Sequence, residues 1–396
     1  MRQTTIALAL VALVAGVVGS GTALAKPKSS GAMSIVATGF NNPRGLTFGP
    51  DGYLYVAEGG LGGTHSSASD PCPQAHGDAA PYFGSTNSPT LGGRISKISR
   101  HGVVSTVVSA LPSSQTSPAL GNLVSGVSAV QFVGHTLYGL LAGAGCSHGV
   151  PTVPNGVFRV GPGNSWTLIA NLSAFQASHP VAQPDDEDFE PDGTWYSMGV
   201  AGDALYPMDS NHGELDRVST SGSISRVLDI SAVVGHVVPT AIASPGHEGD
   251  DEDHGDGDHH GHHGHSWAHD EHGHPAFVIS NLGVFGPGDG NTPNEKVWTL
   301  NGHNLTVRAT GVEQVLGLAF SDGKLYALES SATPGGPTPG TGAIVRIGKN
   351  GPDKTIVSGL VFPTGMTAGP DEALYVSEQG FGFPAGQGRV VRVPIG

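Results

Sequence analysis

The chain has few charged residues, few aromatic residues and almost no cysteine. Only 13% of its 396 residues are Asp, Glu, Lys or Arg, 6% are aromatic, and two are cysteine. Two cysteines exclude the multiple cross-links of a small disulfide-stabilised domain. The 18 Lys and Arg residues are scattered among 33 Asp and Glu residues, so the sequence shows no basic cluster of the kind that binds nucleic acid or an anionic membrane.

The chain also lacks a membrane-spanning run beyond its first 25 residues. Within them, Arg2 precedes an apolar stretch over residues 6–18, and small residues lead to an A-x-A sequence at residues 23–25. This stretch is shorter than the roughly 20 residues that a spanning helix needs. We therefore predict a cleaved export signal over residues 1–25, a short tail over residues 26–32 and a secreted, extracytoplasmic protein. The alternative is an uncleaved membrane anchor.

Glycine and proline are in excess, with 62 and 29 residues, and they recur between strand-like runs. The sequence "NPRGLTFGPDGYLYVAE" (residues 42–58) returns as "FPTGMTAGPDEALYVSE" (residues 362–378). It returns more loosely as "QVLGLAFSDGKLYALE" (residues 314–329). Each copy has a short apolar run, a tight turn and an alternating run, which is typical of a β-hairpin.

The remaining runs of each repeat predict a closed ring. Six copies of a third run, such as "GRISKIS" and "GRVVRV", are followed by only five copies of a fourth. The missing copy stands near the start of the chain, where "MSIVATGF" (residues 33–40) matches "KTIVSGL" (residues 354–360). A first strand that completes the last blade removes an open edge. We predict an all-β fold, a six-bladed β-propeller over residues 33–396 with Ile35 beside Val391. Two β-sandwich domains are the competing interpretation.

The repeat resembles known propeller families. Its hairpin unit is similar to that of the NHL-type and gluconolactonase/streptogramin-lyase-like propellers. In their order, "VATGFNNPRGLTFGPDGYLYVAEGGLGG", "LIANLSAFQASHP" and "GFPAGQGRVVRV" resemble the exported ScyD/ScyE family over about residues 34–396. The resemblance implies a secreted propeller and little about mechanism. In gluconolactonase-like propellers, Glu, Asn and Asp at comparable positions hold a metal that polarises a lactone carbonyl.

Propeller geometry predicts a binding mouth at the centre of one face. Loops from second to third strand, and from blade to blade, share this face, and the long loops of the chain belong to these two classes. The second strands end toward the same face, and an arginine begins the innermost strand of the first blade. The predicted mouth residues are Arg44, Glu58, Asp209, Asn281, Glu329 and Glu378. Their carboxylates either hold Ca²⁺ or accept hydrogen bonds from loop amides. We interpret Arg44 as a salt-bridge partner of these carboxylates in preference to an anion receptor.

The two cysteines, Cys72 and Cys146, fall in equivalent long loops of adjacent predicted blades. In an exported protein this placement predicts one disulfide bond between them. Closing a loop of that length would stabilise the fold by roughly 4 kcal/mol. The alternative is two separate buried thiols.

One segment differs from all others. Residues 246–275, "GHEGDDEDHGDGDHHGHHGHSWAHDEHGHP", hold ten of the 19 histidines and nine carboxylates without any Lys or Arg, in a chain of net charge −15. The segment replaces a tight turn of the fourth blade, so we predict a disordered insertion over residues 245–275 on the face opposite to the mouth. Imidazole binds Zn²⁺ and Ni²⁺. The predicted ligands are His247, His254, His259, His260, His262, His263, His265, His269, His272 and His274. The alternative is a hydrophilic insertion without a ligand.

Together these patterns predict a non-enzymatic binding or scaffold protein. It would present its long loops to a protein or small-molecule partner and carry a transition-metal-binding appendage. The alternative is a metal-dependent hydrolase or lyase, of lactonase-like type, that acts at the acidic mouth.

Overall fold

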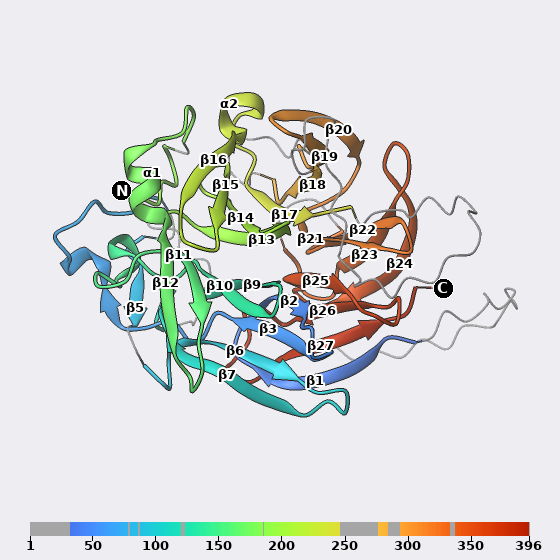
Figure 1. The fold of residues 1–396 in the computed structure, drawn as a ribbon, viewed down its shortest axis with the longest axis horizontal. Coiled ribbons are helices and arrows are strands. Elements are labelled where there is room, and N and C mark those ends of the chain that lie inside the picture. The colour runs from blue at the N-terminus through green and yellow to red at the C-terminus, as the bar shows by residue number, and fades with distance from the viewer. Residues whose placement is uncertain are drawn as a thin grey trace, which may run out of the picture.

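The computed structural model of the chain describes residues 32–77, 80–85, 88–119, 123–184, 186–245, 276–283, 294–332 and 337–395. Within these ranges, six four-stranded antiparallel sheets surround a common axis (Figure 1). Their first strands form a ring, in which each contacts the first strand of the preceding and of the following sheet. The chain is therefore a six-bladed β-propeller. The predicted export signal lies outside the described residues, and so does the predicted histidine-rich insertion apart from its first residue, Pro245.

The blades follow one another along the chain, each running from the axis outward. Blade 1 consists of β2 (Pro43–Phe48), β3 (Leu54–Glu58), β6 (Gly93–Ile98) and β7 (Val104–Leu111). Blade 2 consists of β9 (Val127–Val133), β10 (Thr136–Leu141), β11 (Gly156–Val160) and β12 (Trp166–Asn171). Blade 3 consists of β13 (Trp195–Ala201), β14 (Ala204–Asp209), β15 (Glu214–Ser219) and β16 (Ile224–Asp229).

The second half of the ring repeats this order. Blade 4 consists of β17 (Pro239–Ala243), β18 (Ala276–Asn281), β19 (Lys296–Asn301) and β20 (Asn304–Thr310). Blade 5 consists of β21 (Val315–Ser321), β22 (Lys324–Glu329), β23 (Gly342–Ile347) and β24 (Pro352–Leu360). Blade 6 consists of β25 (Gly365–Ala368), β26 (Leu374–Glu378), β27 (Gly388–Val393) and the first strand of the chain, β1 (Ser34–Phe40).

The predicted closure of the ring is confirmed. Strand β1 pairs antiparallel with β27 and places Ile35 opposite Val391, the pair expected from the sequence. In Figure 1 the blue β1 lies along the red β27, so the two ends of the propeller chain share one sheet. Phe40, the last residue of β1, is fully buried against Leu46 and Val390. The closing strand therefore joins blade 6 to blade 1 through a hydrophobic core as well as through backbone pairing.

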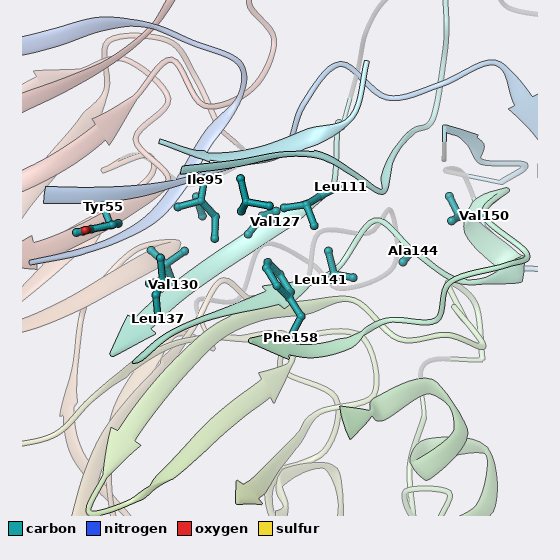
Figure 2. Close-up of a cluster of buried hydrophobic side chains, with 12 residues drawn as sticks. Tyr55, Ile95, Leu111, Val127, Val130, Leu137, Leu141, Ala144, Val150 and Phe158 are labelled. Carbon is teal, nitrogen blue, oxygen red and sulfur yellow. The ribbon is translucent and has the colours of Figure 1, made fainter. Parts of the chain in front are cut away.

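The core lies between neighbouring blades. Figure 2 shows one such cluster, in which Ile95 and Leu111 of blade 1 face Leu141 and Phe158 of blade 2. Such interfaces form because alternate residues of each strand point to opposite faces of its sheet, and both faces of a blade are covered. The strands accordingly carry near-continuous buried runs, as in β3, where all five residues are buried.

A glycine recurs in the first strand of three repeats because these strands approach closely around the axis. A Cβ atom on Gly365 would lie 2.6 Å from the carbonyl oxygen of Arg44, and one on Gly45 would lie 2.9 Å from that of Ser128. Gly317 in blade 5 stands at the same position of the repeat and would bring a Cβ atom within 3.2 Å of the backbone of Met366. The glycine of the hairpin motif is thus required by the tight inner ring.

Two short helices extend the long-loop face, and sequence analysis did not predict them. Helices α1 (Leu172–Ser178) and α2 (Ile230–Val234) directly follow the fourth strands of blades 2 and 3. Each is capped by the last residue of its strand, since Asn171 accepts from the amide of Ala174 and Asp229 from that of Ala232. The matching sequences "NLSA" and "DISA" carried this signal. No helix in the described ranges is both long and apolar enough to cross a bilayer.

A small additional sheet and the disulfide bond order the loops of blades 1 and 2. The sheet joins β4 (His65–Ser66), β5 (Phe83–Ser85) and β8 (Ser113–Gln115). Two 3₁₀ turns, η1 (Ser67–Ser69) and η2 (Cys146–His148), lie against each other. Cys72 and Cys146 form a disulfide bond, as predicted, with their Cα atoms 6.1 Å apart.

Candidate functional site

The glutamates that end the second strands of blades 1 and 6 are held by neighbouring backbone amides and arginines of the protein itself. Glu58, the last residue of β3, accepts from the backbone amide of Asn41 at 2.7 Å and pairs with the guanidinium of Arg94 at 2.6 Å. Glu378, at the end of β26, has the same arrangement, with the amide of Val361 at 2.7 Å and Arg389 at 2.8 Å. Both arginines lie directly opposite in the third strand. Both carboxylates are fully buried, so these contacts satisfy groups that would otherwise be costly to bury.

Glu329 of blade 5 has the same position but no arginine. Its cross-strand partner is Ala343, and its carboxylate accepts from the backbone amide of Glu313 at 3.1 Å. Burial raises the pKa of Glu329 to about 7, and the nearby Glu313 carboxylate acts in the same direction. Glu329 lacks an arginine partner because the third strand of blade 5 begins with Gly-Ala ("GAIVRI"). The third strands of blades 1 and 6 begin with Gly-Arg.

This raised pKa predicts a pH-dependent stability. Protonated Glu329 is favoured in the folded state, so its contribution to the free energy of unfolding is complete below pH 4.5 and is lost as the pH rises through about 7. We expect the stability of Glu329→Gln, measured by urea unfolding, not to fall over this pH range. At pH 8 its free energy of unfolding should exceed that of the wild type by about 1–3 kcal/mol. As a control, Glu378→Gln should be less stable than the wild type at pH 8, because it loses the ion pair with Arg389. Equal pH profiles for Glu329→Gln and the wild type would contradict the prediction.

Asn281 and Arg44 also bind backbone groups. Asn281 accepts from the amide of Lys296 at 2.8 Å and donates to the carbonyl of Val237 at 2.9 Å. The guanidinium of Arg44 donates to the carbonyl oxygens of Gly380 and, at 2.7 Å, of Val124. Among the described residues Arg44 forms no ion pair, contrary to its interpretation as a partner of the mouth carboxylates. The reason is that Arg94 and Arg389 already occupy the glutamates beside it.

The side chains of Arg44 and Tyr196 are buried at the centre of the ring. Burial lowers the pKa of Arg44 and raises that of Tyr196 to about 12. Tyr196 of blade 3 donates to the carbonyl oxygen of Thr364, at the start of blade 6 on the opposite side of the ring, at 2.8 Å. The space left between the first strands, beside Tyr196, is only about 70 Å³. The axis is therefore a packed centre and leaves room for little more than water.

Blade 3 differs from the others, because here acidic residues gather. Asp209 ends β14 and lies directly opposite Glu214, the first residue of β15. Ligand atoms of Asp209, His212 and Glu214 lie within 4.8 Å of one another, and all three residues are buried. In the part of the chain that the structure describes, this is the one group of three or more His, Cys, Asp or Glu residues with metal-ligand spacing. Of the predicted mouth residues only Asp209 belongs to it.

The four predicted carboxylates consequently do not share one centre. Glu58, Glu329 and Glu378 stay in their separate blades, whereas Ca²⁺ requires six to eight oxygen atoms around one point. Sequence reasoning missed Glu214 and Asp216, although "GELDRV" carries an acidic residue where "GRISKI" and "GRVVRV" carry arginine. Burial and the negative charge of Glu214 raise the pKa of Asp216 to about 9.

A second buried network links the long loops of blades 1, 2 and 3. The carboxylate of Glu190 accepts from the hydroxyl of Tyr82 and lies 3.6 Å from Nε2 of His148. Burial lowers the pKa of His148, but the Glu190 carboxylate, together with the charge of Asp192 and the carbonyl of Ala144, more than offsets this, so the pKa lies above its usual value. The backbone amide of Ser147 donates to Asp192 at 2.8 Å. These contacts stabilise the loop face around the disulfide bond.

A pocket of about 670 Å³ opens between the loops of blades 1, 2 and 6. Leu61 and Thr64 line it from the loop after β3, Gln115 and Val124 from the segment before β9, and Phe383 from the loop after β26. Its lining combines apolar side chains with amide and hydroxyl groups and includes no Asp, Glu, Lys, Arg or His among the described residues. Such a pocket suits a small uncharged ligand better than an ion.

Solved structures share the fold at low sequence identity. The PQQ-bound form of aldose sugar dehydrogenase from Streptomyces coelicolor is similar with a TM-score of 0.51 and 12% identity, over 93% of this chain and 99% of that chain. Regucalcin from Agrobacterium tumefaciens, described as a calcium-binding protein, is similar with a TM-score of 0.50 and 13% identity, over 92% and 94% of the two chains. At these identities the likeness shows the propeller fold alone. No protein-family model matches the chain, and no curated protein matches it, so membership of the ScyD/ScyE family stays a prediction.

Proposed function

We propose that the chain is a non-enzymatic binding protein, which takes a small uncharged ligand in the pocket between blades 1, 2 and 6. The observation that carries this proposal is the contrast on the long-loop face. The carboxylates of Glu58 and Glu378 are bound by amides and arginines of the protein itself, whereas the neighbouring pocket has free volume and a neutral lining. A lactonase-like metal needs open carboxylate oxygens around one point, and Glu58, Glu329 and Glu378 form no such centre.

The histidine-rich segment adds a second function to this proposal, the binding of transition-metal ions. Residues 246–275 stand in the sequence between β17 and β18, which pair as the first and second strands of blade 4. The strand ends that flank the segment, at Ala243 and Ala276, lie on the face opposite to the pocket. Ten histidines provide ligands for Zn²⁺ or Ni²⁺, and binding weakens below about pH 6 as imidazole is protonated.

We further propose that the protein is exported. The first 25 residues have the composition of a cleaved signal, and the Cys72–Cys146 disulfide bond is compatible with an oxidising compartment. In such a compartment the long-loop face is available to small molecules or proteins outside the cytoplasm.

Deletion of residues 246–274 tests the role of the histidine-rich segment. We expect the truncated protein to lose the rapidly exchanging Zn²⁺ and Ni²⁺ that the full chain takes up, because ten imidazole ligands are gone. The unfolding temperature of the metal-free protein should stay almost unchanged, since an insertion at a surface turn adds little to a folded ring. Isothermal titration and thermal unfolding of both forms measure the two effects. Unchanged fast metal uptake after truncation would contradict the assignment.

The enzyme alternative has a separate test. Turnover of a lactone that is stimulated by a divalent metal, and is lost in Glu58→Gln with folding retained, would replace the binding proposal. Binding of a neutral ligand that is weakened by substitution of Gln115, without any turnover, supports it.

A further inference from the structure

The cross-strand pair at the end of the second strand carries opposite charges in blades 1 and 6 but like charges in blade 3. Glu58 faces Arg94 and Glu378 faces Arg389, whereas Asp209 faces Glu214. Like charges directly opposite each other destabilise a sheet. In the low dielectric of a buried site this cost increases, and both side chains here are fully buried. In blades 1 and 6 an arginine balances this position, whereas Asp209 of blade 3 accepts from the backbone amides of Thr194 and Asn211.

The protein supplies only part of that positive charge. Arg226 of β16 donates to Oε2 of Glu214 at 2.6 Å, and among the described residues it is the one Lys or Arg that pairs with this cluster. Asp216 lies two residues beyond Glu214, hence on the same face of β15, and interacts electrostatically with both Glu214 and Asp209. When all three carboxylates are ionised, the single guanidinium of Arg226, which pairs with Glu214, leaves two negative charges to be balanced.

His212 faces this cluster with one ring nitrogen held by a backbone carbonyl. Its Nε2 atom lies 3.0 Å from the carbonyl oxygen of Glu190, which can only accept, so Nε2 carries the proton. The other ring nitrogen, Nδ1, lies 3.7 Å from Oδ2 of Asp209 and so faces the cluster. A carbonyl that holds the outer nitrogen is the usual way in which proteins orient a histidine toward a metal. The ring of Phe189 stacks on His212 at 5.0 Å between centroids and fixes its plane.

Several buried oxygen atoms in the same place lack hydrogen-bond partners. They are Oε1 of Glu214, both carboxylate oxygens of Asp216 and Oε1 of Gln176. All three residues are at most 2% exposed. The amide of Gln176 reaches this cluster from α1 and donates to Oδ2 of Asp209. A buried polar atom without a partner costs on the order of 1–3 kcal/mol, so four of them together point to a missing ligand.

We propose that Asp209, His212 and Glu214 bind a divalent transition-metal ion inside blade 3, with Asp216 and Gln176 providing further oxygen atoms. A divalent cation balances the two excess negative charges and converts the like-charge pair into a pair of ligands. One imidazole among carboxylates favours Zn²⁺ or Mn²⁺ over Ca²⁺, which prefers oxygen ligands alone. The site is closed to solvent, so its ion stabilises the fold and binds independently of the histidine-rich segment.

The test uses the full chain, purified without a metal-affinity column and dialysed against a chelator. The chelator removes metal ions from exposed ligands, such as the histidine-rich segment, before it removes an ion from a buried site. Zn and Mn are then measured by mass spectrometry in the wild type and in His212→Asn, Glu214→Gln and His101→Asn. His101 lies in an exposed turn and serves as the matched control. We expect about one equivalent in the wild type and the control, and a loss of tenfold or more in the two cluster variants. If the chelator empties the wild type, Zn²⁺ or Mn²⁺ added back should raise its unfolding temperature by roughly 5 °C, but not that of the variants.

Three results would overturn the proposal. The first is a wild type that neither retains metal nor gains thermal stability from Zn²⁺ or Mn²⁺. The second is retention of the ion in both cluster variants, which would place it elsewhere. The third is stabilisation by Ca²⁺ alone, which would remove the role of His212. Should the variants fail to fold, anomalous diffraction from wild-type crystals soaked in Zn²⁺ or Mn²⁺ decides the matter. A peak between Asp209 and His212 supports the site, and its absence rejects it.

Discussion

Removal of the first strand, so that the chain begins at Asn41, is expected to leave the protein largely unfolded at 25 °C. Strand β1 is the fourth strand of blade 6, and its loss exposes the edge of β27 and the core between blades 6 and 1. Domains are stable by only about 5–15 kcal/mol, and in a closed ring a defect in one blade also weakens both of its neighbours. Far-ultraviolet circular dichroism and urea unfolding measure the effect.

Point variants of the same strand separate packing from pairing. Phe40 is fully buried, whereas Ile35 is 57% exposed on the opposite side. Phe40→Ala should lower the free energy of unfolding by about 3–5 kcal/mol, because it leaves a cavity between blades. Ile35→Ala keeps the same backbone pairing and should cost less than about 1 kcal/mol. If Phe40→Ala also cost less than about 1 kcal/mol, backbone pairing alone would account for the closure of the ring. That result would contradict the argument from the core.

Replacement of both cysteines by serine is expected to lower the free energy of unfolding by roughly 4 kcal/mol, since the bond closes a loop with a sequence separation of 74 residues. The bond also connects the loops of blades 1 and 2 beside the small sheet β4–β5–β8. We therefore expect faster amide hydrogen exchange at Ser113–Gln115 in addition to global destabilisation.

The double variant has a direct control, because reduction of the wild-type disulfide should produce the same loss of stability. Urea unfolding of the wild type with and without a thiol reductant measures it. A double variant that unfolds at the same urea concentration as the oxidised wild type would contradict the expectation. A reduced wild type that is less stable than the double variant would indicate an additional effect of the free thiols.

The architecture was predictable because it repeats in the sequence. Hairpin motifs with a glycine at fixed spacing, six third runs and five fourth runs predict six blades, and the offset predicts the pairing of Ile35 with Val391. The disulfide bond followed from the same ring geometry, which puts Cys72 and Cys146 in neighbouring loops. Such features depend on local pattern and on chain order, and a sequence records both.

The roles of the polar residues were not predictable in the same way. Glu58, Glu329 and Asp209 occupy one position of the repeat, but their partners are an arginine, an alanine and a second carboxylate across the strand pair. Arg44 was expected to pair with a carboxylate and instead binds backbone carbonyls of segments far away in the sequence. The charge and availability of a side chain depend on its three-dimensional neighbours.

The sequence alone thus determined the number of blades, their order and the closure of the ring, because hydrophobic alternation and turn residues specify strands locally. Only the tertiary structure decided which acidic groups face an arginine across the strand pair and which face a second carboxylate. Burial and cross-strand register set the energy of a charge, and both arise only when distant strands meet.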